Sequence, residues 1–206
     1  MSKLAILGHG SVGKALAKRF AAVGGHQILI GSRSPAGKNG PEGVRITSVE
    51  EACRASDVLF LAVPAEVAVE TLAGCEVDGK IVIDCTNPLK WLGRPVWDPP
   101  AAGSMAQALA EAFPGARVVK GFSTFGAAFH EDPDLCGEAV DVHLAGDDEA
   151  AKTEVADLAR AAGFHPVDVG PLDNAGLLES LAILWIQLAG PGGVGRDFAF
   201  QIRRRG

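Results

Sequence analysis

The chain has 206 residues, of which 48% are hydrophobic, and its formal net charge at pH 7 is −6. This length allows one sizeable domain or one domain with a small appendage, and the apolar fraction excludes a disordered chain. The negative charge argues against a nucleic-acid partner, which would need a basic face. The longest apolar run in the last third, LAILWI at 181–186, is far short of the roughly 20 residues of a membrane span.

Short apolar runs alternate with helical patterns along the chain. The runs predict strands at 3–7, 26–31, 44–47, 57–64, 80–88, 116–122, 140–146 and 165–170, and helical periodicity predicts helices at 11–24, 48–56, 147–163 and 172–190. The strands are too continuously apolar to alternate, which is typical of parallel strands buried on both faces. We therefore expect an α/β doubly wound, mostly parallel sheet with helices on both faces and a short C-terminal helical appendage.

The segment GHGSVG at 8–13 matches the pattern GxGxxG between the first strand and the first helix. In that context the pattern predicts a Rossmann-type dinucleotide site. Gly8 allows the tight turn, Gly10 lets the backbone approach a pyrophosphate, and Gly13 lets the helix pack on the strand. His9 lies inside this loop and could approach the phosphates, although we expect it to face solvent.

The segment GSRSPAGK at 31–38 follows the second strand, where a ribose-binding acid would stand about 20 residues after the glycines. Ser32, Arg33 and Lys38 occupy this region instead. A hydroxyl, a forked guanidinium and an ammonium suit the 2′-phosphate of NADP(H) better than the free 2′-hydroxyl of NAD(H). The sequence thus predicts an NADP-binding domain over residues 1–170.

The four cysteines form no CxxC pair and the histidines show no paired spacing, so neither predicts a metal site. We expect the cysteines to be reduced core or near-core residues. The N-terminal segment MSKLAILGHG puts glycines where a signal peptide would continue its apolar region, so a cytoplasmic protein is expected.

The composition excludes several classes of NAD(P)-dependent redox chemistry. The chain has no tyrosine, which excludes the Tyr and Lys pair of short-chain dehydrogenases. His130, in FHEDPD, is the candidate histidine near acidic residues, but that segment resembles an acidic surface loop and is assigned no catalytic role. About 35 residues follow the last strand, too few for the second domain of hydroxyacid or imine reductases. Hydride transfer between two ring cofactors remains, because it needs close positioning but no protein acid.

Several segments together resemble the F420-dependent NADP oxidoreductase family, whose N-terminal domain also occurs in STEAP-type ferric reductases. They are LGHGSVG, GSR with Lys38, the AVP strand end, DCTNPL, ARVVKGFST, HLAGDDEAAK and the closing VDVGPLDNAGLLESLAILWIQLA. The resemblance runs from Lys3 to about Phe200. It implies NADPH at the carboxyl edge of the sheet, a deazaflavin or flavin stacked on the nicotinamide, and a dimer built on the C-terminal helix.

By this resemblance the phosphate loop is Gly8, Gly10, Ser11, Val12 and Gly13, and the 2′-phosphate site is Ser32, Arg33 and Lys38. The floor beneath the nicotinamide is Ala62, Val63, Pro64, Asn87 and Pro88, and the wall at the second ring is Ser123, Thr124, Phe125 and Gly126. Members that use the deazaflavin tend to carry histidine at the place of Ser123 and proline at that of Gly126. The acidic stretch 131–141 also departs from the family pattern, so the resemblance does not fix the identity of the electron acceptor.

The leading interpretation is an NADP(H)-dependent oxidoreductase that passes hydride between NADP(H) and a ring acceptor, with coenzyme F420 the first candidate. The alternatives are an NADPH-dependent flavin, quinone or ferric reductase and a non-catalytic NADPH-binding sensor. Residues 171–206 are expected to carry the second-cofactor site and the dimer contact. The apolar stripe expected to pair two copies is Leu177, Leu181, Leu184, Trp185 and Leu188, and Glu179 and Gln187 interrupt the apolar pattern of this helix.

Overall fold

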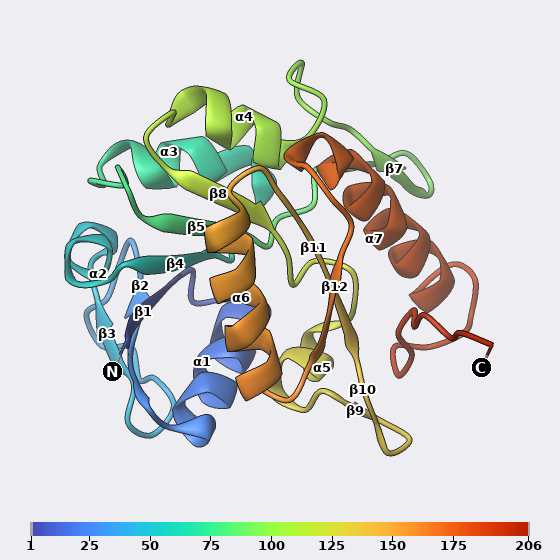
Figure 1. Ribbon diagram of the computed structural model, residues 1–206, viewed down its shortest axis with the longest axis horizontal. Helices are drawn as coiled ribbons and strands as arrows, with labels where there is room; N and C mark the ends of the chain where they lie inside the picture. The colour runs from blue at the N-terminus through green and yellow to red at the C-terminus, as the bar shows by residue number, and fades with distance from the viewer. Residues whose placement is uncertain (1, 206) are drawn as a thin grey trace.

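The computed structural model describes residues 2–205, and it contains one eight-stranded sheet in the order β12-β11-β8-β5-β4-β1-β2-β3 (Figure 1). All neighbouring strands are parallel except β8 and β11, which run antiparallel. The predicted doubly wound, mostly parallel α/β fold is confirmed. Among the helices of residues 2–205, none combines the length and apolar composition that crossing a bilayer requires.

The strands of the large sheet are β1 (Ser2–Leu7), β2 (His26–Gly31), β3 (Arg45–Thr47), β4 (Val58–Leu61), β5 (Ile81–Asp84), β8 (Arg117–Lys120), β11 (Asp141–Gly146) and β12 (His165–Asp168). The α-helices are α1 (Ser11–Val23), α2 (Val49–Ala55), α3 (Ala68–Ala73), α4 (Met105–Ala112), α5 (Ala127–Glu131), α6 (Glu149–Ala161) and α7 (Ala175–Ala189). Two 3-10 turns, η1 (Ala65–Val67) and η2 (Leu172–Asn174), precede α3 and α7.

Each strand contributes side chains to two cores, one on each face of the sheet. In β1, Leu4 and Ile6 point to the core under α1, α5 and α6, while Ala5 and Leu7 point to the core under α2, α3 and α4. This alternation is the ordinary period of a strand, and both sets are apolar because both faces are covered. The carboxyl ends of the parallel strands therefore meet at one edge, where ligands bind in such folds.

The sequence patterns missed three short helices and two hairpins. The helices are α3, α4 and α5, and the hairpins pair β6 (Leu89–Trp91) with β7 (Pro95–Trp97) and β9 (Asp134–Leu135) with β10 (Glu138–Ala139). These helices have six, eight and five residues, and such short segments sample each helical face too few times for a clear periodicity. The hairpin β6–β7 matters for the site because α7 packs against β7 (Figure 1).

The expectation of four reduced cysteines is wrong, because Cys53 and Cys75 form a disulfide across a Cα–Cα distance of 5.9 Å. Their separation of 22 residues gave no signal of a pair. Only the fold places α2 and the end of α3 side by side on the same face of the sheet. Cys85 is a buried free thiol and Cys136 an exposed one.

His130 does not lie in a surface loop, as the acidic residues around it suggested, but is 1% exposed in α5. Its Nε2 lies 2.9 Å from the carbonyl oxygen of Phe122. Phe122 has a φ of +55°, a left-handed conformation that bulky residues adopt only when their surroundings impose it. A neutral His130 that donates from Nε2 therefore stabilises the turn that ends β8 and begins the segment 123–126.

Replacement of His130 by glutamine is expected to make stability less sensitive to mild acid. Burial lowers the pKa of His130 below its usual 6.5. As the pH falls below that value, the unfolded chain binds a proton that the folded chain does not, so the wild-type free energy of unfolding decreases. One group contributes up to about 1.4 kcal/mol per pH unit. Urea unfolding between about pH 7 and pH 5 measures the slope. Equal slopes for both proteins would assign the acid sensitivity to other groups.

Candidate functional site

The loop after β1 brings the backbone close to neighbouring chain at two glycines. Gly8 has a φ of +125°, and a Cβ there would lie 2.2 Å from the carbonyl oxygen of Ala62. A Cβ on Gly13 would lie 2.2 Å from the carbonyl oxygen of Gly8. Around Gly10, by contrast, no heavy atom of the described chain beyond Gly10 and its two chain neighbours lies within 4 Å of the position of a Cβ. Gly8 and Gly13 are therefore required by packing, whereas Gly10 leaves open space in front of the helix.

The N-terminus of α1 faces that space. Gly10 is its N-cap, and within the described chain neither a capping side chain nor an acidic residue in the first turn satisfies the free N–H groups. A helix end of this kind offers hydrogen-bond donors and a positive partial charge to an anion. Ser11, Val12 and Gly13 form this first turn. They do not line the cleft described next, so only their backbone N–H groups and their packing on β1 bear on a ligand at the helix end.

A cleft of about 520 Å³ lies at the carboxyl ends of β1, β2 and β4. Nine predicted cofactor-binding residues line it: Gly8, His9, Gly10, Ser32, Arg33, Lys38, Ala62, Val63 and Pro64. Five further residues that the sequence reasoning missed complete the lining: Gly31, Ser34, Val49, Val67 and Thr71. Val49 belongs to α2, while Val67 and Thr71 belong to η1 and α3, so α2 forms one wall of the cleft and η1 with α3 forms another.

The basic end of the cleft is organised around Ser32, which is 5% exposed. Its Oγ accepts a hydrogen bond of 2.8 Å from Lys38 Nζ and one of 3.3 Å from the backbone N–H of Ser34. Arg33 and Lys38 are exposed, and no carboxylate within residues 2–205 forms an ion pair with either of them. The two cations thus carry uncompensated charge at the end of β2.

His9 differs from the expectation of a solvent-facing histidine. The residue is half-buried and lines the cleft, and its Nε2 is inaccessible to solvent without a partner in the described chain. A buried polar atom without a partner is uncommon and calls for a ligand or an ordered water. His9 lies at the phosphate loop, so its ring nitrogen is available to a group bound there.

The predicted nicotinamide floor is only partly assembled in this cleft, because Asn87 and Pro88 do not line it. Asn87 donates from Nδ2 to the carbonyl oxygen of Ser123 over 2.8 Å and so ties the end of β5 to the end of β8. Its Oδ1, together with the hydroxyls of Thr86 and Ser123, is buried without a partner in the described chain. Three unpartnered polar atoms therefore gather where β5 and β8 end.

The predicted wall at 123–126 is divided by the fold. Phe125 is 7% exposed, and its ring stacks on Phe164 in the core at 5.7 Å between centroids. Thr124 is also buried, with Oγ1 3.4 Å from His143 Nδ1. Only Gly126 lines a hollow, since the side chains of the other three point into the protein. Backbone turns at strand ends decide such directions, and the sequence carries no signal for them.

That hollow, of about 450 Å³, lies between hairpin β6–β7, α5 and the end of α7. It is lined by Trp91, Gly126, Ala127, Ala128, Trp185, Ile186, Ala189, Gly190, Pro191 and Arg196. Trp185 is held in place because its Nε1 donates to the carbonyl oxygen of Phe198 over 2.8 Å and its ring stacks on Phe198. A Cβ on Gly126 would lie 2.8 Å from the Trp185 ring, which explains glycine at this position. We call this site the tryptophan hollow.

Three fully buried charges join α7 to the sheet. Lys120 Nζ, at the end of β8, lies 2.9 Å from Asp84 Oδ2 and 3.4 Å from Glu179 Oε1, and it also donates to the carbonyl oxygen of Thr86. Glu179 further accepts from Trp97 Nε1 at 2.9 Å and from the backbone N–H of Met105 at 2.8 Å. Burial raises the pKa of the Glu179 carboxyl, and the Lys120 charge opposes that shift. Glu179, which in the sequence only interrupts an apolar pattern, thus connects α7 to β8, β7 and α4.

The described residues hold no candidate metal centre, since no three His, Cys, Asp or Glu side chains of residues 2–205 gather suitably. The site therefore consists of a cleft with an open helix N-terminus and a basic end, a set of unpartnered polar atoms at the ends of β5 and β8, and the tryptophan hollow. This arrangement can bind an extended anionic ligand along the sheet edge and a second, planar ligand beyond β8.

Comparisons with known proteins agree with this geometry. The family described as NADP oxidoreductase, coenzyme F420-dependent, matches residues 3–88. The metalloreductase STEAP3 of Rattus norvegicus is 33% identical over 185 residues, which are 88% of this chain and 36% of that protein. The chain spans about a third of the length of the curated relatives it matches.

Solved structures show the same architecture over nearly the whole chain. A protein of Arthrobacter sp. FB24, described as a candidate F420-dependent NADP-reductase, has a TM-score of 0.84 and 28% identity, covering 99% of this chain and 100% of its own. The hypothetical protein SMa0349 of Sinorhizobium meliloti has a TM-score of 0.74 and 32% identity, covering 85% of this chain and 88% of its own. The chain therefore belongs to the family of NADP oxidoreductases described as coenzyme F420-dependent.

Proposed function

We propose that the protein transfers hydride between NADP(H), bound in the cleft, and a planar ring acceptor bound in the tryptophan hollow. Coenzyme F420 is the first candidate acceptor. The observation that carries the proposal is the basic end of the cleft, where Ser32, Arg33 and Lys38 stand in the place of a ribose-binding acid. NADPH is a coenzyme of the cell interior, so we place this activity in the cytoplasm.

The residues of the cleft suit the two phosphate-bearing parts of NADP(H). The uncapped N-terminus of α1 and the open space at Gly10 suit the pyrophosphate, with His9 Nε2 available beside it. Arg33 and Lys38 suit the 2′-phosphate, because neither is neutralised by a carboxylate of the described chain. NADPH, when bound, supplies a hydride, which is two electrons with one proton.

The protein's own residues would bind and orient the two rings. Strands of a sheet lie about 4.8 Å apart, so β4 and β8, with β5 between them, are about 10 Å apart. The cleft ends at Ala62–Pro64 after β4, and the tryptophan hollow begins at Gly126 after β8. The buried polar atoms of Thr86, Asn87 and Ser123 lie at the strand ends between them, behind the surface that the two rings would share. No protein acid is required, since positioning at about 3–3.5 Å suffices for hydride transfer.

The tryptophan hollow suits a flat, anionic acceptor. Trp91, 59% exposed, and the Trp185 ring offer aromatic surface, and Arg196 offers a cation. The alternative functions predicted from the sequence differ in which of the two cavities they use. A flavin, a quinone or a ferric chelate would use the same hollow, and a non-catalytic NADPH sensor would use only the cleft.

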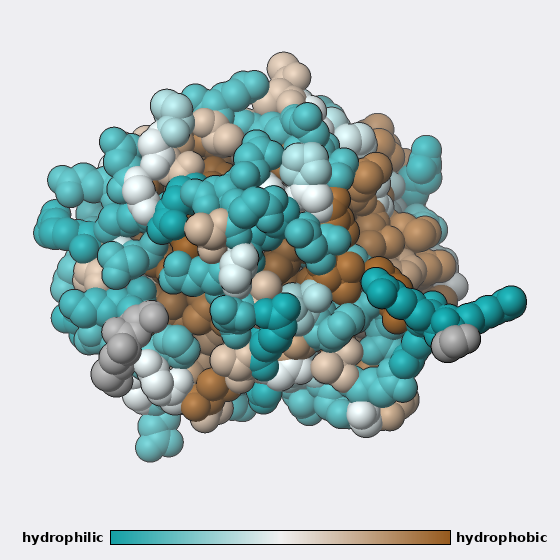
Figure 2. All heavy atoms as spheres, viewed as in Figure 1, coloured by the Kyte–Doolittle hydropathy of each residue, from teal (hydrophilic) through white to brown (hydrophobic). Residues whose placement is uncertain are grey.

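We also propose a homodimer formed through α7. Its inward side holds Ala175, Leu178, Glu179 and Ala182, whereas Leu177 is 67% and Leu184 is 47% exposed. Leu177 and Leu184, with the half-buried Leu181 and Leu188, form an apolar strip on α7. Figure 2 shows apolar surface over this helix. Burying a leucine side chain contributes about 1.5–3 kcal/mol to association, and a two-fold pairing buries the same leucines on both copies. Trp185, expected in the contact, is instead packed on Phe198 of its own chain.

Replacement of Arg33 by alanine is expected to weaken NADPH binding by about 1.5–3 kcal/mol, the scale of a hydrogen bond to a charged group. NADH lacks the 2′-phosphate, so its affinity should hardly change and serves as the internal control. Calorimetric titration of both nucleotides measures the difference. Equal losses for the two nucleotides would contradict the 2′-phosphate assignment.

Steady-state oxidation of NADPH is expected with the deazaflavin as acceptor. Turnover with a flavin, quinone or ferric chelate alone would support the second reading, and binding without turnover would support the sensor. Replacement of Arg196 by alanine should raise the acceptor KM by about 10-fold or more, as the loss of a charged hydrogen bond predicts, and leave the NADPH Kd unchanged. Arg160→Ala, an exposed change in α6, is the matched control. An unchanged KM in Arg196→Ala would place the acceptor outside the tryptophan hollow.

Replacement of Leu184 by glutamate is expected to convert a dimer into a monomer, because the charge would be buried at the contact between two α7 helices. Val69→Glu introduces the same charge at an exposed apolar position of α3 and should leave the dimer intact. Light scattering at micromolar concentration reads out both. A wild-type chain that is monomeric under these conditions would refute the pairing, whatever the variants do.

A further inference from the structure

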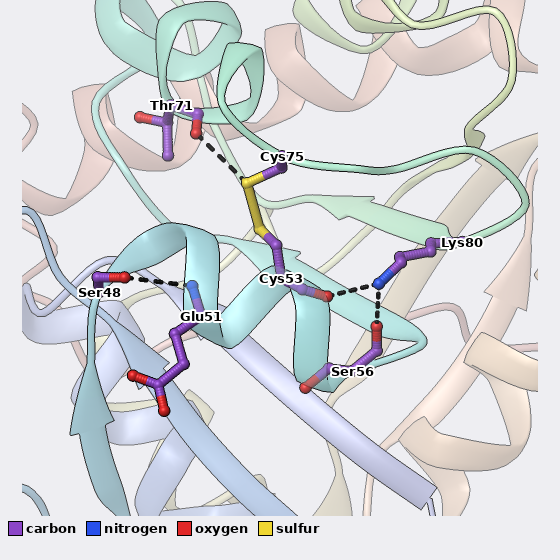
Figure 3. Close-up of a disulfide and its surroundings, with 7 residues drawn as sticks. All are labelled: Ser48, Glu51, Cys53, Ser56, Thr71, Cys75 and Lys80. Carbon is purple, nitrogen blue, oxygen red and sulfur yellow. Dashed lines mark hydrogen bonds between the residues drawn. A yellow bond between two sulfur atoms is a disulfide. The ribbon is translucent and has the colours of Figure 1, made fainter.

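The two walls of the nucleotide cleft are joined by a covalent bond one helical turn behind the cleft. Val49 lines one wall from α2, and Thr71 lines the other from α3. Cys53 lies one turn after Val49 within α2, and Cys75 follows Thr71 by four positions, just beyond the end of α3. Their disulfide connects the walls, and Cys75 Sγ lies 3.8 Å from the carbonyl oxygen of Thr71 (Figure 3).

The wall formed by α2 is well anchored without the disulfide. At its start the Ser48 hydroxyl accepts a hydrogen bond of 3.2 Å from the backbone N–H of Glu51. At its end Lys80 donates to the carbonyl oxygens of Cys53 and Ser56, at 2.5 and 2.8 Å (Figure 3). The helix also packs on β1 and β2. Breaking the disulfide would therefore leave Val49 in place.

The wall formed by α3 is anchored less firmly. This helix has six residues, and within the described chain no side chain caps its N-terminus. It buries only Ala68 and Leu72 in the core. A helix this short depends on tertiary contacts for its stability, and few buried contacts mark a segment that opens at low cost. The disulfide is therefore the contact that joins the weaker wall to the stronger one.

We propose that the Cys53–Cys75 disulfide is a redox-controlled clamp on the nucleotide cleft. The oxidised bond holds α3, and with it Val67 and Thr71, against bound NADP(H), and reduction releases α3 and weakens the binding of the nucleotide. This regulation rests on the proposed NADP(H) site. Disulfides in a reducing compartment are usually transient or redox-sensing, which fits the cytoplasmic setting proposed above.

The chemistry requires an external dithiol of the reducing compartment. Its thiolate attacks Cys75 Sγ, because Cys75 is partly exposed whereas Cys53 is fully buried. The second thiol of the reductant then closes its own disulfide, so that two electrons and two protons pass to Cys53 and Cys75 as thiols. Cys85 does not compete, since burial raises the pKa of its thiol and keeps it protonated.

Calorimetric titration with NADPH, before and after treatment with excess dithiothreitol, tests the clamp. The reduced protein is expected to bind NADPH at least about fivefold more weakly, the lower end of ordinary coupling between two sites. Thiol titration of the denatured, untreated chain should find two free cysteines, Cys85 and Cys136. Four free cysteines in aerobically purified protein, or equal NADPH affinities in both states, would overturn the proposal.

Two variants separate the clamp from other effects of the reductant. Cys75→Ser should bind NADPH as weakly as the reduced wild type and no longer respond to dithiothreitol, whereas Cys136→Ser should respond fully. Hydrogen exchange should become faster in α3 and remain unchanged in α2 on reduction, which a general loss of stability would not produce. Equal responses in Cys75→Ser and the wild type would refute the clamp. Oxidised protein that binds no NADPH would instead refute the proposed function itself.

Discussion

The buried ion network of Asp84, Lys120 and Glu179 is the contact on which the arrangement of the site depends. Moving a charge out of water costs several kcal/mol, and the cost is offset only where partners and hydrogen bonds satisfy it. All three side chains are fully buried, and they come from β5, β8 and α7. The network can therefore form in one arrangement only, with α7 docked across the carboxyl edge of the sheet.

This docking creates the tryptophan hollow. Glu179 also binds Trp97 and the first residue of α4, so hairpin β6–β7 and α4 are held to the same helix. On the sheet side, Lys120 binds the carbonyl oxygen of Thr86 and holds the end of β5 between the cleft and the hollow. The nucleotide cleft, by contrast, needs only β1, β2, β4 and the helices beside them. The protein thus combines a cleft that depends on the ends of β1, β2 and β4 with a hollow that exists only because α7 is attached.

The two halves of the site also differ in how rigidly they are held. The phosphate loop is constrained by backbone contacts at Gly8 and Gly13 that leave no room for a side chain. The other end of the cleft is bounded by α2, which is capped by Ser48, and by α3, which has no side-chain cap and buries only Ala68 and Leu72. A disulfide at this boundary links two segments of unequal stability, and such a link can control the weaker one without changing the fold of the rest.

The sequence by itself determined the parallel α/β fold, because continuous apolar strands and short-range helical patterns are local properties. Its patterns also located the glycine loop after β1 and the basic end of the cleft, since each lies within eight consecutive residues beside one strand. Tertiary structure alone decided the role of Glu179, the burial of His130, the pairing of Cys53 with Cys75 and the direction of the Phe125 side chain. Each of these depends on residues far apart in the chain, and a pattern read along the sequence carries no information about which distant segments meet.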